Sequence, residues 1–294
     1  MSARALTLST TAADLVSLTK PRLSSLVLAT TAGGMWLAPG QLSLSRALVA
    51  MLATAGTVGA ANAFNCFIER DSDRYMKRTA NRPLPSGRMD PGVALWFGLS
   101  LAALSLPALW LSANLLTAVL GLIALLSYVL MYTPLKARTS AAMLVGAVPG
   151  ALPPLMGWTA VTNQVDAGGY ALFAILFLWQ IPHFIAIALF RKEEYAAAGL
   201  TSLPLERGDE SSRLQLLLYT VALVPTTLLP YQLGIAGLWY LAAALLLGAA
   251  FLALAAWGFF RRLDKPWARQ TFFFSLLYLT GLFAALMLDS QTHG

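Results

Sequence analysis

Nine apolar segments, each close to the length that crosses a bilayer, determine what this chain can fold into. They lie near residues 23–39, 46–66, 92–111, 114–133, 140–160, 170–190, 213–232, 235–260 and 271–289. A transmembrane helix needs about twenty apolar residues, and lipid admits only helices and closed barrels. The composition agrees, because 58% of the 294 residues are hydrophobic and 11% are charged. We therefore predict an all-α polytopic membrane protein with nine transmembrane helices, in which residues 1–294 form one domain.

The cysteine count, the first twenty residues and the net charge argue against a disulfide-linked protein, a removable signal peptide and a nucleic-acid-binding protein. Cys66 is the one cysteine, so no intrachain disulfide can form. The first twenty residues lack the basic start, apolar core and small-residue cleavage site of a signal peptide. The net charge of +7 belongs to the loops of a membrane protein. We therefore expect no nucleic-acid partner.

The basic residues predict an orientation in the membrane. Of the 20 Lys and Arg residues, all but Arg46 fall in the N-terminal segment or in alternate connections between the apolar segments. Cytoplasmic connections carry such an excess of Lys and Arg. We expect a multi-pass protein of the bacterial inner membrane, with its N-terminus in the cytoplasm and its C-terminus outside.

A polar array follows the second apolar segment. Asn62, Asn65, Glu69 and Asp73 are three or four residues apart, so they share one face if the helix continues. Such an oxygen-only set suits Mg²⁺, with Mn²⁺ as the alternative, because Mg²⁺ binds through one or two carboxylates and substrate phosphates. A solvated, salt-bridged loop at the membrane edge is the simpler alternative.

Asp71 falls on the opposite face of this helix. It joins the array only if the helix unwinds, and otherwise it pairs with Arg70 or Arg74. Basic side chains that follow and could bind anionic oxygens are Lys77, Arg78 and Arg82.

A second polar cluster closes the sixth apolar segment. His183 lies inside the apolar run, and Arg191, Glu193 and Glu194 lie at its cytoplasmic end. Glu194 is eleven residues after His183, about three helical turns, so both can share a face. The alternatives are a core histidine bonded to a carbonyl and a charge-paired helix end.

Two further stretches bear on the same face. In residues 132–139, Lys136 and Arg138 either reach anionic oxygens or are ordinary cytoplasmic charges. The prolines and glycines of residues 147–158 predict a break in the fifth helix, which a membrane protein tolerates where the chain lines a cavity.

Two acidic clusters with basic residues at one membrane face suit a lipid-linked diphosphate. Divalent ions would bridge carboxylates to phosphates, and Lys and Arg would neutralise the remaining charge. Catalysis would be ionisation of an allylic diphosphate with stabilisation of the leaving group. A transporter is the alternative from another class, although it would need charges near the bilayer midplane.

The motifs resemble a known superfamily. The pattern N-x-x-x-[DE]-x-x-x-D followed by K-R-T-A-N-R-P-L-P-S-G resembles the first aspartate motif of the UbiA-type intramembrane prenyltransferases. Lys20-Pro21-Arg22 and Tyr132…Lys136 match further motifs of that superfamily. Within it, W-Q-I-P-H-F with E-Y-A-A-A-G, and P-P-L-M-G-W, resemble the protoheme IX farnesyltransferase (heme O synthase) family.

The resemblance implies nine helices around a central cavity, farnesyl diphosphate as donor and Mg²⁺ as cofactor. It implies heme b as a substrate, whose vinyl group gains the farnesyl group as water adds to give heme O. A heme A synthase or an oxidase assembly factor is the implied partner. Another aromatic acceptor, such as a hydroxybenzoate or chlorophyll-type precursor, and a non-catalytic heme-handling factor remain the alternatives.

Position by position, the resemblance implies two sets of site residues. The catalytic set, of which all but Lys136 would hold the metal, is Asn65, Glu69, Asp73, Glu194 and Lys136. The substrate-binding set is Arg22, Asn62, Asp71, Lys77, Arg78, Arg82, Tyr132, Arg138, Trp179, Gln180, His183, Arg191, Glu193 and Tyr195. Arg22, Lys136 and Arg191 are expected to neutralise the diphosphate, and His183 is expected to contact the heme iron or a propionate. Glu69 and Glu194 stand where relatives usually have Asp.

Overall fold

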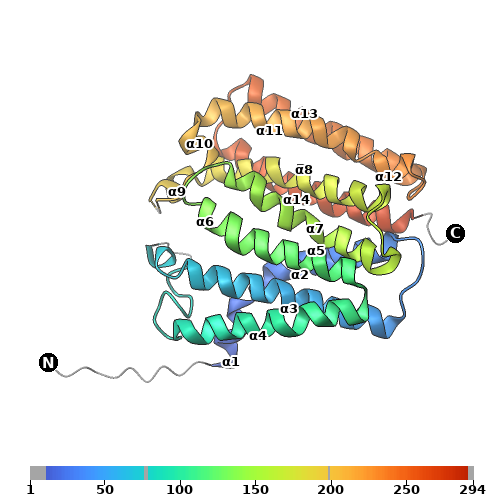
Figure 1. Cartoon of the computed structure of the whole chain (residues 1–294). Helices are drawn as coiled ribbons and strands as arrows, with labels where there is room; N and C mark the ends of the chain where they lie inside the picture. Colours follow the sequence, from blue (N-terminus) through green and yellow to red (C-terminus); the bar gives the residue numbers. More distant parts are fainter. Residues whose placement is uncertain (1–10, 76–78, 198, 291–294) are drawn as a thin grey trace.

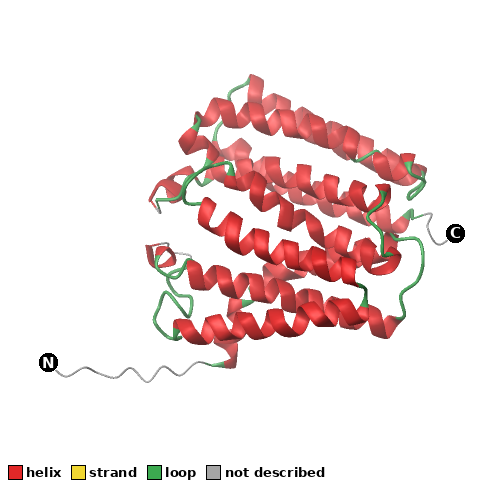
Figure 2. Ribbon diagram, in the orientation of Figure 1, coloured by secondary structure: helices red, strands yellow, loops and turns green. Residues whose placement is uncertain are grey.

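The computed structural model describes residues 11–75, 79–197 and 199–290, and these residues fold almost entirely into helices (Figures 1 and 2). An isolated bridge between Ala236 and Ser290 is the one strand-like pairing within those ranges. The all-α prediction is therefore confirmed. Two of the predicted substrate-binding residues, Lys77 and Arg78, lie outside the described residues.

The helices follow one another along the chain with short connections. In order they are α1 (Ala12–Leu18), α2 (Pro21–Leu37), α3 (Leu44–Ile68), η1 (Ser72–Tyr75), α4 (Pro91–Ser112), α5 (Leu115–Leu126), η2 (Ser127–Tyr132), α6 (Thr133–Leu135), α7 (Ala142–Thr162), α8 (Ala167–Phe190), α9 (Lys192–Ala197), α10 (Leu203–Glu206), α11 (Gly208–Thr226), α12 (Leu229–Gln232), α13 (Leu238–Phe260) and α14 (Lys265–Leu288).

Within the described ranges, eight helices are long and apolar enough to cross a membrane, so the predicted count of nine is one too high by this measure. The missing one is α2, whose 17 residues span about 26 Å by the helical rise. It still runs the length of the bundle, since Lys20 lines the cavity described below and Trp36 Nε1 donates to Met287 O, 3.3 Å away at the far end. The positions of the apolar segments were correct, and the first was predicted with the 17 residues that α2 has.

The two most buried spanning helices, α7 and α8, lie in the middle of the bundle, with α3 and α4 on one side and α11 and α13 on the other (Figure 1). Aromatic side chains of α7, α8, α13 and α14 fill the core between them, among them Trp158, Trp179, Tyr240 and Tyr278. The outer helices expose large apolar side chains, as lipid contact requires.

The prediction that α7 is broken was wrong. The helix is continuous from Ala142 to Thr162 although Pro149, Pro153 and Pro154 lie inside it. Proline is tolerated in a membrane helix where neighbouring helices compensate for the lost backbone hydrogen bond. Here α2 and α8 pack on α7, which remains one continuous helix.

The contact between α2 and α7 is made by backbone atoms. A Cβ atom on Gly34 would lie 2.0 Å from the carbonyl oxygen of Pro154, and one on Gly157 would lie 2.0 Å from that of Thr31. Small residues permit such close approach between membrane helices. Gly34 and Gly157, the glycine of P-P-L-M-G-W, therefore serve helix packing.

The polar connections gather at one end of the bundle. Figure 1 shows the α3–α4 connection and the α8–α11 region at the same end, at the left, and the end of α14 at the other. At that far end Arg46, the exception to the charge asymmetry, donates to Ser112 O (2.8 Å) and Ala113 O (2.9 Å). It therefore caps the last turn of α4, which leaves four carbonyls without helical partners.

Candidate active site

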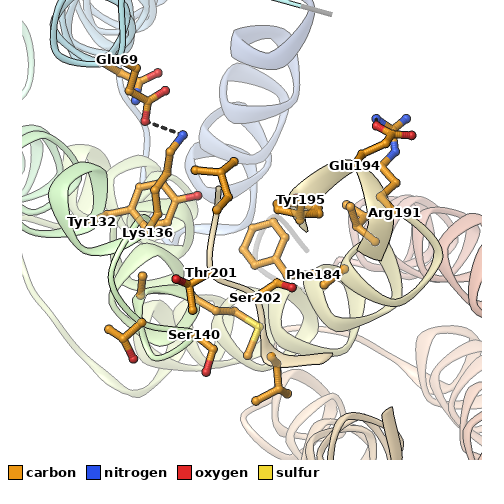
Figure 3. A pocket seen from close by; sticks show the side chains of 18 of the residues that line it. Glu69, Tyr132, Lys136, Ser140, Phe184, Arg191, Glu194, Tyr195, Thr201 and Ser202 are labelled. Carbon is orange, nitrogen blue, oxygen red and sulfur yellow. Dashed lines mark hydrogen bonds and ion pairs between the residues drawn. The ribbon is translucent and has the colours of Figure 1, made fainter. Parts of the chain in front are cut away.

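A cavity of about 320 Å³ lies at the polar end of the bundle (Figure 3). Its volume is near the lower limit of the roughly 300–1,000 Å³ of small-molecule sites. Its walls come from the end of α3, the η2–α6 region, the start of α7, the end of α8 and the segment that follows α9. The polar or aromatic residues among its lining are Lys20, Asn65, Glu69, Asp73, Arg82, Tyr128, Tyr132, Lys136, Thr139, Ser140, Phe184, Arg191, Glu194, Tyr195, Thr201 and Ser202.

The predicted array of Asn65, Glu69 and Asp73 comes together at this cavity. The α-helix ends at Ile68, yet the backbone N–H of Asp73 still donates to Glu69 O at 2.8 Å. The four-residue spacing therefore keeps the three side chains on one face through the change to 3₁₀ geometry. All three are buried, with at most 7% of each residue exposed.

Both carboxylates of the array have a basic partner. Lys136 Nζ forms an ion pair with Glu69 Oε1, drawn in Figure 3, and Arg82 Nη1 donates to Asp73 Oδ2 at 2.7 Å. A buried carboxylate is costly unless it is paired, so these contacts are what allow the acids to lie here. The structure thus brings Lys136 and Arg82 to the array, in agreement with their predicted places.

Lys20, and not Arg22, is the N-terminal cation that faces the array. Lys20 has a left-handed backbone (φ 49°) before Pro21 starts α2, and its Nζ donates to Asn65 Oδ1. Burial lowers the pKa of Lys20. Asn62 lies outside the cavity, where its Nδ2 donates to Thr19 O at 3.1 Å and fixes the residue before Lys20. Arg22 is exposed and does not line the cavity.

The second cluster lies across the cavity from the first. Figure 3 shows Arg191 and Glu194 on the side opposite Glu69, and they form an ion pair at 3.4 Å. Tyr195 lines the cavity beside them. Glu193 turns away and is ion-paired with a lysine at the start of α14. Of the two adjacent glutamates, the structure therefore places only Glu194 at the site.

Two predicted substrate-binding residues lie at the surface. Asp71 is within 3.8 Å of Arg70 and 3.9 Å of Arg74, which is the surface pairing given above as an alternative. Arg138 is exposed and absent from the cavity lining.

Three predicted substrate-binding residues of α8 also lie away from the cavity. His183 Nδ1 is 2.7 Å from Ser275 Oγ, and its ring stacks on Trp179 with centroids 4.7 Å apart. Trp179 Nε1 donates to Ser275 O at 2.7 Å. Gln180 Nε2 donates to Ala147 O at 3.2 Å. These side chains join α8 to α14 and α7, as core residues do.

The oxygen donors at the cavity fit a magnesium ion that is shared with a substrate. In the described part of the chain no three His, Cys, Asp or Glu residues gather as a closed metal cage. The array of Asn65, Glu69 and Asp73 has one amide and two carboxylates. Mg²⁺ binds in this way, through one or two carboxylates together with substrate phosphates and waters.

Several cavity residues were not among the predicted site residues. They are Lys20, Tyr128, Thr139, Ser140, Phe184, Thr201 and Ser202. Tyr128 precedes Tyr132 by one helical turn, and their rings are 5.3 Å apart, so helical spacing could have identified it. The residues at 139–140 and 201–202 carried no such signal, because their meeting depends on tertiary structure.

Comparisons with known proteins identify the family of this chain. The sequence profile of the UbiA prenyltransferase family matches residues 27–277. A protein of Myxococcus xanthus named protoheme IX farnesyltransferase is 78% identical over 98% of each chain. A structure of a digeranylgeranylglyceryl phosphate synthase is 20% identical, with a TM-score of 0.82 over 94% of this chain and 97% of that one. A UbiA homologue of Archaeoglobus fulgidus bound to GPP and Mg²⁺ is 19% identical, with a TM-score of 0.67 over 93% of this chain and 99% of that one. The chain therefore belongs to the UbiA prenyltransferase family.

Proposed function

We propose that this protein transfers the farnesyl group of farnesyl diphosphate to a vinyl group of heme b, giving heme O and diphosphate. The observation that carries the proposal is the cavity in which Glu69 and Asp73 lie buried beside Lys136 and Arg82. The name of the 78% identical relative supports the donor and the acceptor. A transporter is excluded by membership of a prenyltransferase family.

Asn65, Glu69 and Asp73 would hold Mg²⁺, with Glu194 facing them across the cavity. The Archaeoglobus homologue, bound to Mg²⁺ with a prenyl diphosphate, supports this assignment. When bound, the ion supplies positive charge to the diphosphate oxygens and so makes the diphosphate a better leaving group.

The basic residues would stabilise the departing diphosphate. Lys20, Arg82 and Lys136 converge on the array and are each hydrogen-bonded or ion-paired to one of its members. With Glu69 and Asp73 holding the ion, these three cations would be available to the phosphate oxygens. Charge-assisted hydrogen bonds to the developing anion lower the barrier because they strengthen as the charge forms.

The aromatic residues would face the reacting carbon. The reacting carbon is C1 of the farnesyl group, which is bonded to a diphosphate oxygen. As this C1–O bond breaks, its electron pair leaves with the diphosphate and C1 becomes cationic. Tyr128 and Tyr132 line the cavity next to Glu69, and an aromatic face attracts a cation. The terminal vinyl carbon of heme b then bonds to C1, and water adds to the other vinyl carbon with loss of a proton.

The acceptor needs more room than the cavity offers. At about 320 Å³ it suits one small ligand, not a prenyl diphosphate and a macrocycle together. We therefore expect the walls to move when both substrates bind. The charge asymmetry supports a site on the cytoplasmic face, with the N-terminus inside, the C-terminus outside and the chain in the bacterial inner membrane.

Incubation of the purified protein with farnesyl diphosphate, heme b and Mg²⁺ tests the proposal. We expect diphosphate release and a porphyrin whose mass has increased by one farnesyl group and one hydroxyl group. Glu69→Gln is the matched control, because it keeps the shape of the side chain and removes its charge. Diphosphate release without a change in the porphyrin mass would show that heme b is not the acceptor.

A further inference from the structure

One wall of the cavity is the segment that follows α9, which packs on α8 and α11 through α10 and the buried Leu203. Leu200, Thr201, Ser202 and Leu203 line the cavity from this side, and Figure 3 shows Thr201 and Ser202 beside Ser140. Ser202 Oγ is buried and has no hydrogen-bond partner in the described part of the chain. The segment therefore faces the substrates directly.

Two glycines flank this segment and let the chain turn sharply at each end of it. Gly199 (φ 65°) and Gly208 (φ 81°) both have left-handed backbones, and a Cβ atom on either would meet nothing within 4 Å. Positive φ at an open position is where a chain turns sharply with little steric restraint. We refer to residues 199–208 as the cover segment.

Two side chains of the cover segment attach it to the turn before α7. Glu206 Oε2 accepts from the backbone N–H of Ser140 at 2.6 Å, and Thr201 Oγ1 donates to Ala137 O at 3.1 Å. The hydrogen bond from Ser140 lowers the pKa of Glu206, so the carboxylate stays ionised at neutral pH. A carboxylate at the start of a 21-residue helix is also favoured by the helix dipole.

The same turn carries the lysine that pairs with Glu69. Lys136 N donates to Tyr132 O, Thr139 N donates to Leu135 O, and Ser140 is buried, so the turn is one hydrogen-bonded unit. Contacts to Ala137 and Ser140 therefore restrain both the cover segment and the backbone that holds Lys136.

We propose that Glu206 is a positioning residue which, together with Thr201, holds the cover segment closed against the 137–140 turn and shields the reacting farnesyl group from bulk water. The inference rests on the proposed farnesyl transfer. An allylic cation that meets bulk water is captured as farnesol: the C1–O bond to diphosphate breaks, a C1–O bond to water forms, and water loses a proton. A closed cover segment excludes this reaction because water can no longer reach C1 freely.

The measurement is the ratio of farnesol to farnesylated heme formed by the purified full-length protein with Mg²⁺. We expect Glu206→Ala and Thr201→Val each to raise this ratio several-fold. The ratio for Glu206→Gln should lie between the values of these variants and of the parent, because the uncharged amide oxygen can still accept the hydrogen bond from Ser140 N. Glu210→Ala is the control, since Glu210 is an exposed glutamate on α11 that pairs at 3.8 Å with Arg262; it should leave the ratio unchanged.

Hydrogen exchange tests the contact independently of turnover. In Glu206→Ala, peptides that contain Ser140 and residues 200–203 should exchange faster than in the parent, whereas peptides of α13 should not. Unchanged exchange would overturn the proposal, and so would faster exchange with an unchanged farnesol ratio. If the parent forms no farnesylated heme, the proposed acceptor is wrong, while the exchange data still decide whether Glu206 holds the segment.

Discussion

Replacing Gly34 with alanine tests how the cavity depends on helix packing far from it. The new Cβ would lie 2.0 Å from Pro154 O and 2.9 Å from the carbonyl carbon. The adjacent Gly33 has its nearest neighbour at 3.4 Å, and that neighbour is the flexible end of the Phe283 side chain. The two positions differ by one residue on the same helix and provide a matched pair.

The magnitude follows from these distances. Ordinary contact begins near 3.4 Å, so α2 must move about 1.4 Å away from α7 at this crossing. Overpacking of a close contact costs roughly 1–3 kcal/mol. We expect the upper part of this range, because the Cβ atom is fixed to one helix backbone and the Pro154 oxygen belongs to the other, so neither can rotate away. The midpoint of thermal unfolding should fall by roughly 3–5 °C.

Turnover should fall as well, because Lys20 precedes the first residue of α2 and reaches Asn65 across the cavity. A misplacement of about 1 Å at a reacting group costs roughly 100-fold in rate. Thermal unfolding in detergent and diphosphate release measure the two effects. Gly33→Ala should remain close to the parent in both assays. Equal behaviour of Gly33→Ala and Gly34→Ala would refute the argument that backbone contact sets the position of α2.

Three further predictions concern the metal, the histidine and the orientation. Removal of divalent metal should stop turnover, and Asp73→Asn, which keeps an acceptor for Arg82, should lower kcat about 100-fold or more at an unchanged Tm; full turnover with excess chelator would contradict the metal site. His183→Ala should lower Tm and weaken the binding of both substrates, and so should Ser275→Ala, because the two side chains are hydrogen-bonded to each other. A loss of affinity for heme alone would instead indicate that His183 belongs to the acceptor site. Reporter fusions at the C-terminus and within residues 191–213 should report opposite sides of the membrane, and signals from one side would refute the orientation.

Local patterns were sufficient to predict the helices and the first array. Hydropathy depends only on composition along the chain, and it located every long helix. Asn65, Glu69 and Asp73 stay on one face beyond the end of α3, because the backbone N–H of Asp73 still donates to the carbonyl of Glu69, four residues earlier. Sequence patterns are reliable where the backbone remains close to one regular geometry.

The predictions failed where the backbone departs from that geometry. The shared face of His183 and Glu194 assumed one continuous helix, but α8 ends at Phe190 and Arg191 has φ −108° and ψ 19°. The change of direction leaves Glu194 at the cavity and His183 against α14. In the same way, the left-handed conformation of Lys20 places that lysine at the cavity where the sequence favoured Arg22. In each case the backbone conformation of one non-helical residue, Arg191 or Lys20, determines which side chain reaches the cavity.

The charges of the cavity explain why it has no closed metal cage. Its formally charged lining residues in the described ranges are Lys20, Arg82, Lys136, Arg191, Glu69, Asp73 and Glu194. Cations outnumber carboxylates by one, so a divalent ion alone would enter a site that is already slightly positive. A diphosphate alone would meet the buried carboxylates, and only the two together leave every charge near an opposite one. Because burial makes each unpaired charge costly, the site is complementary to the metal and the diphosphate as a unit. A prenyl diphosphate would thus supply the remaining ligands of the metal ion. Until the substrate binds, the ion pairs with lysine and arginine neutralise the carboxylates of the cavity.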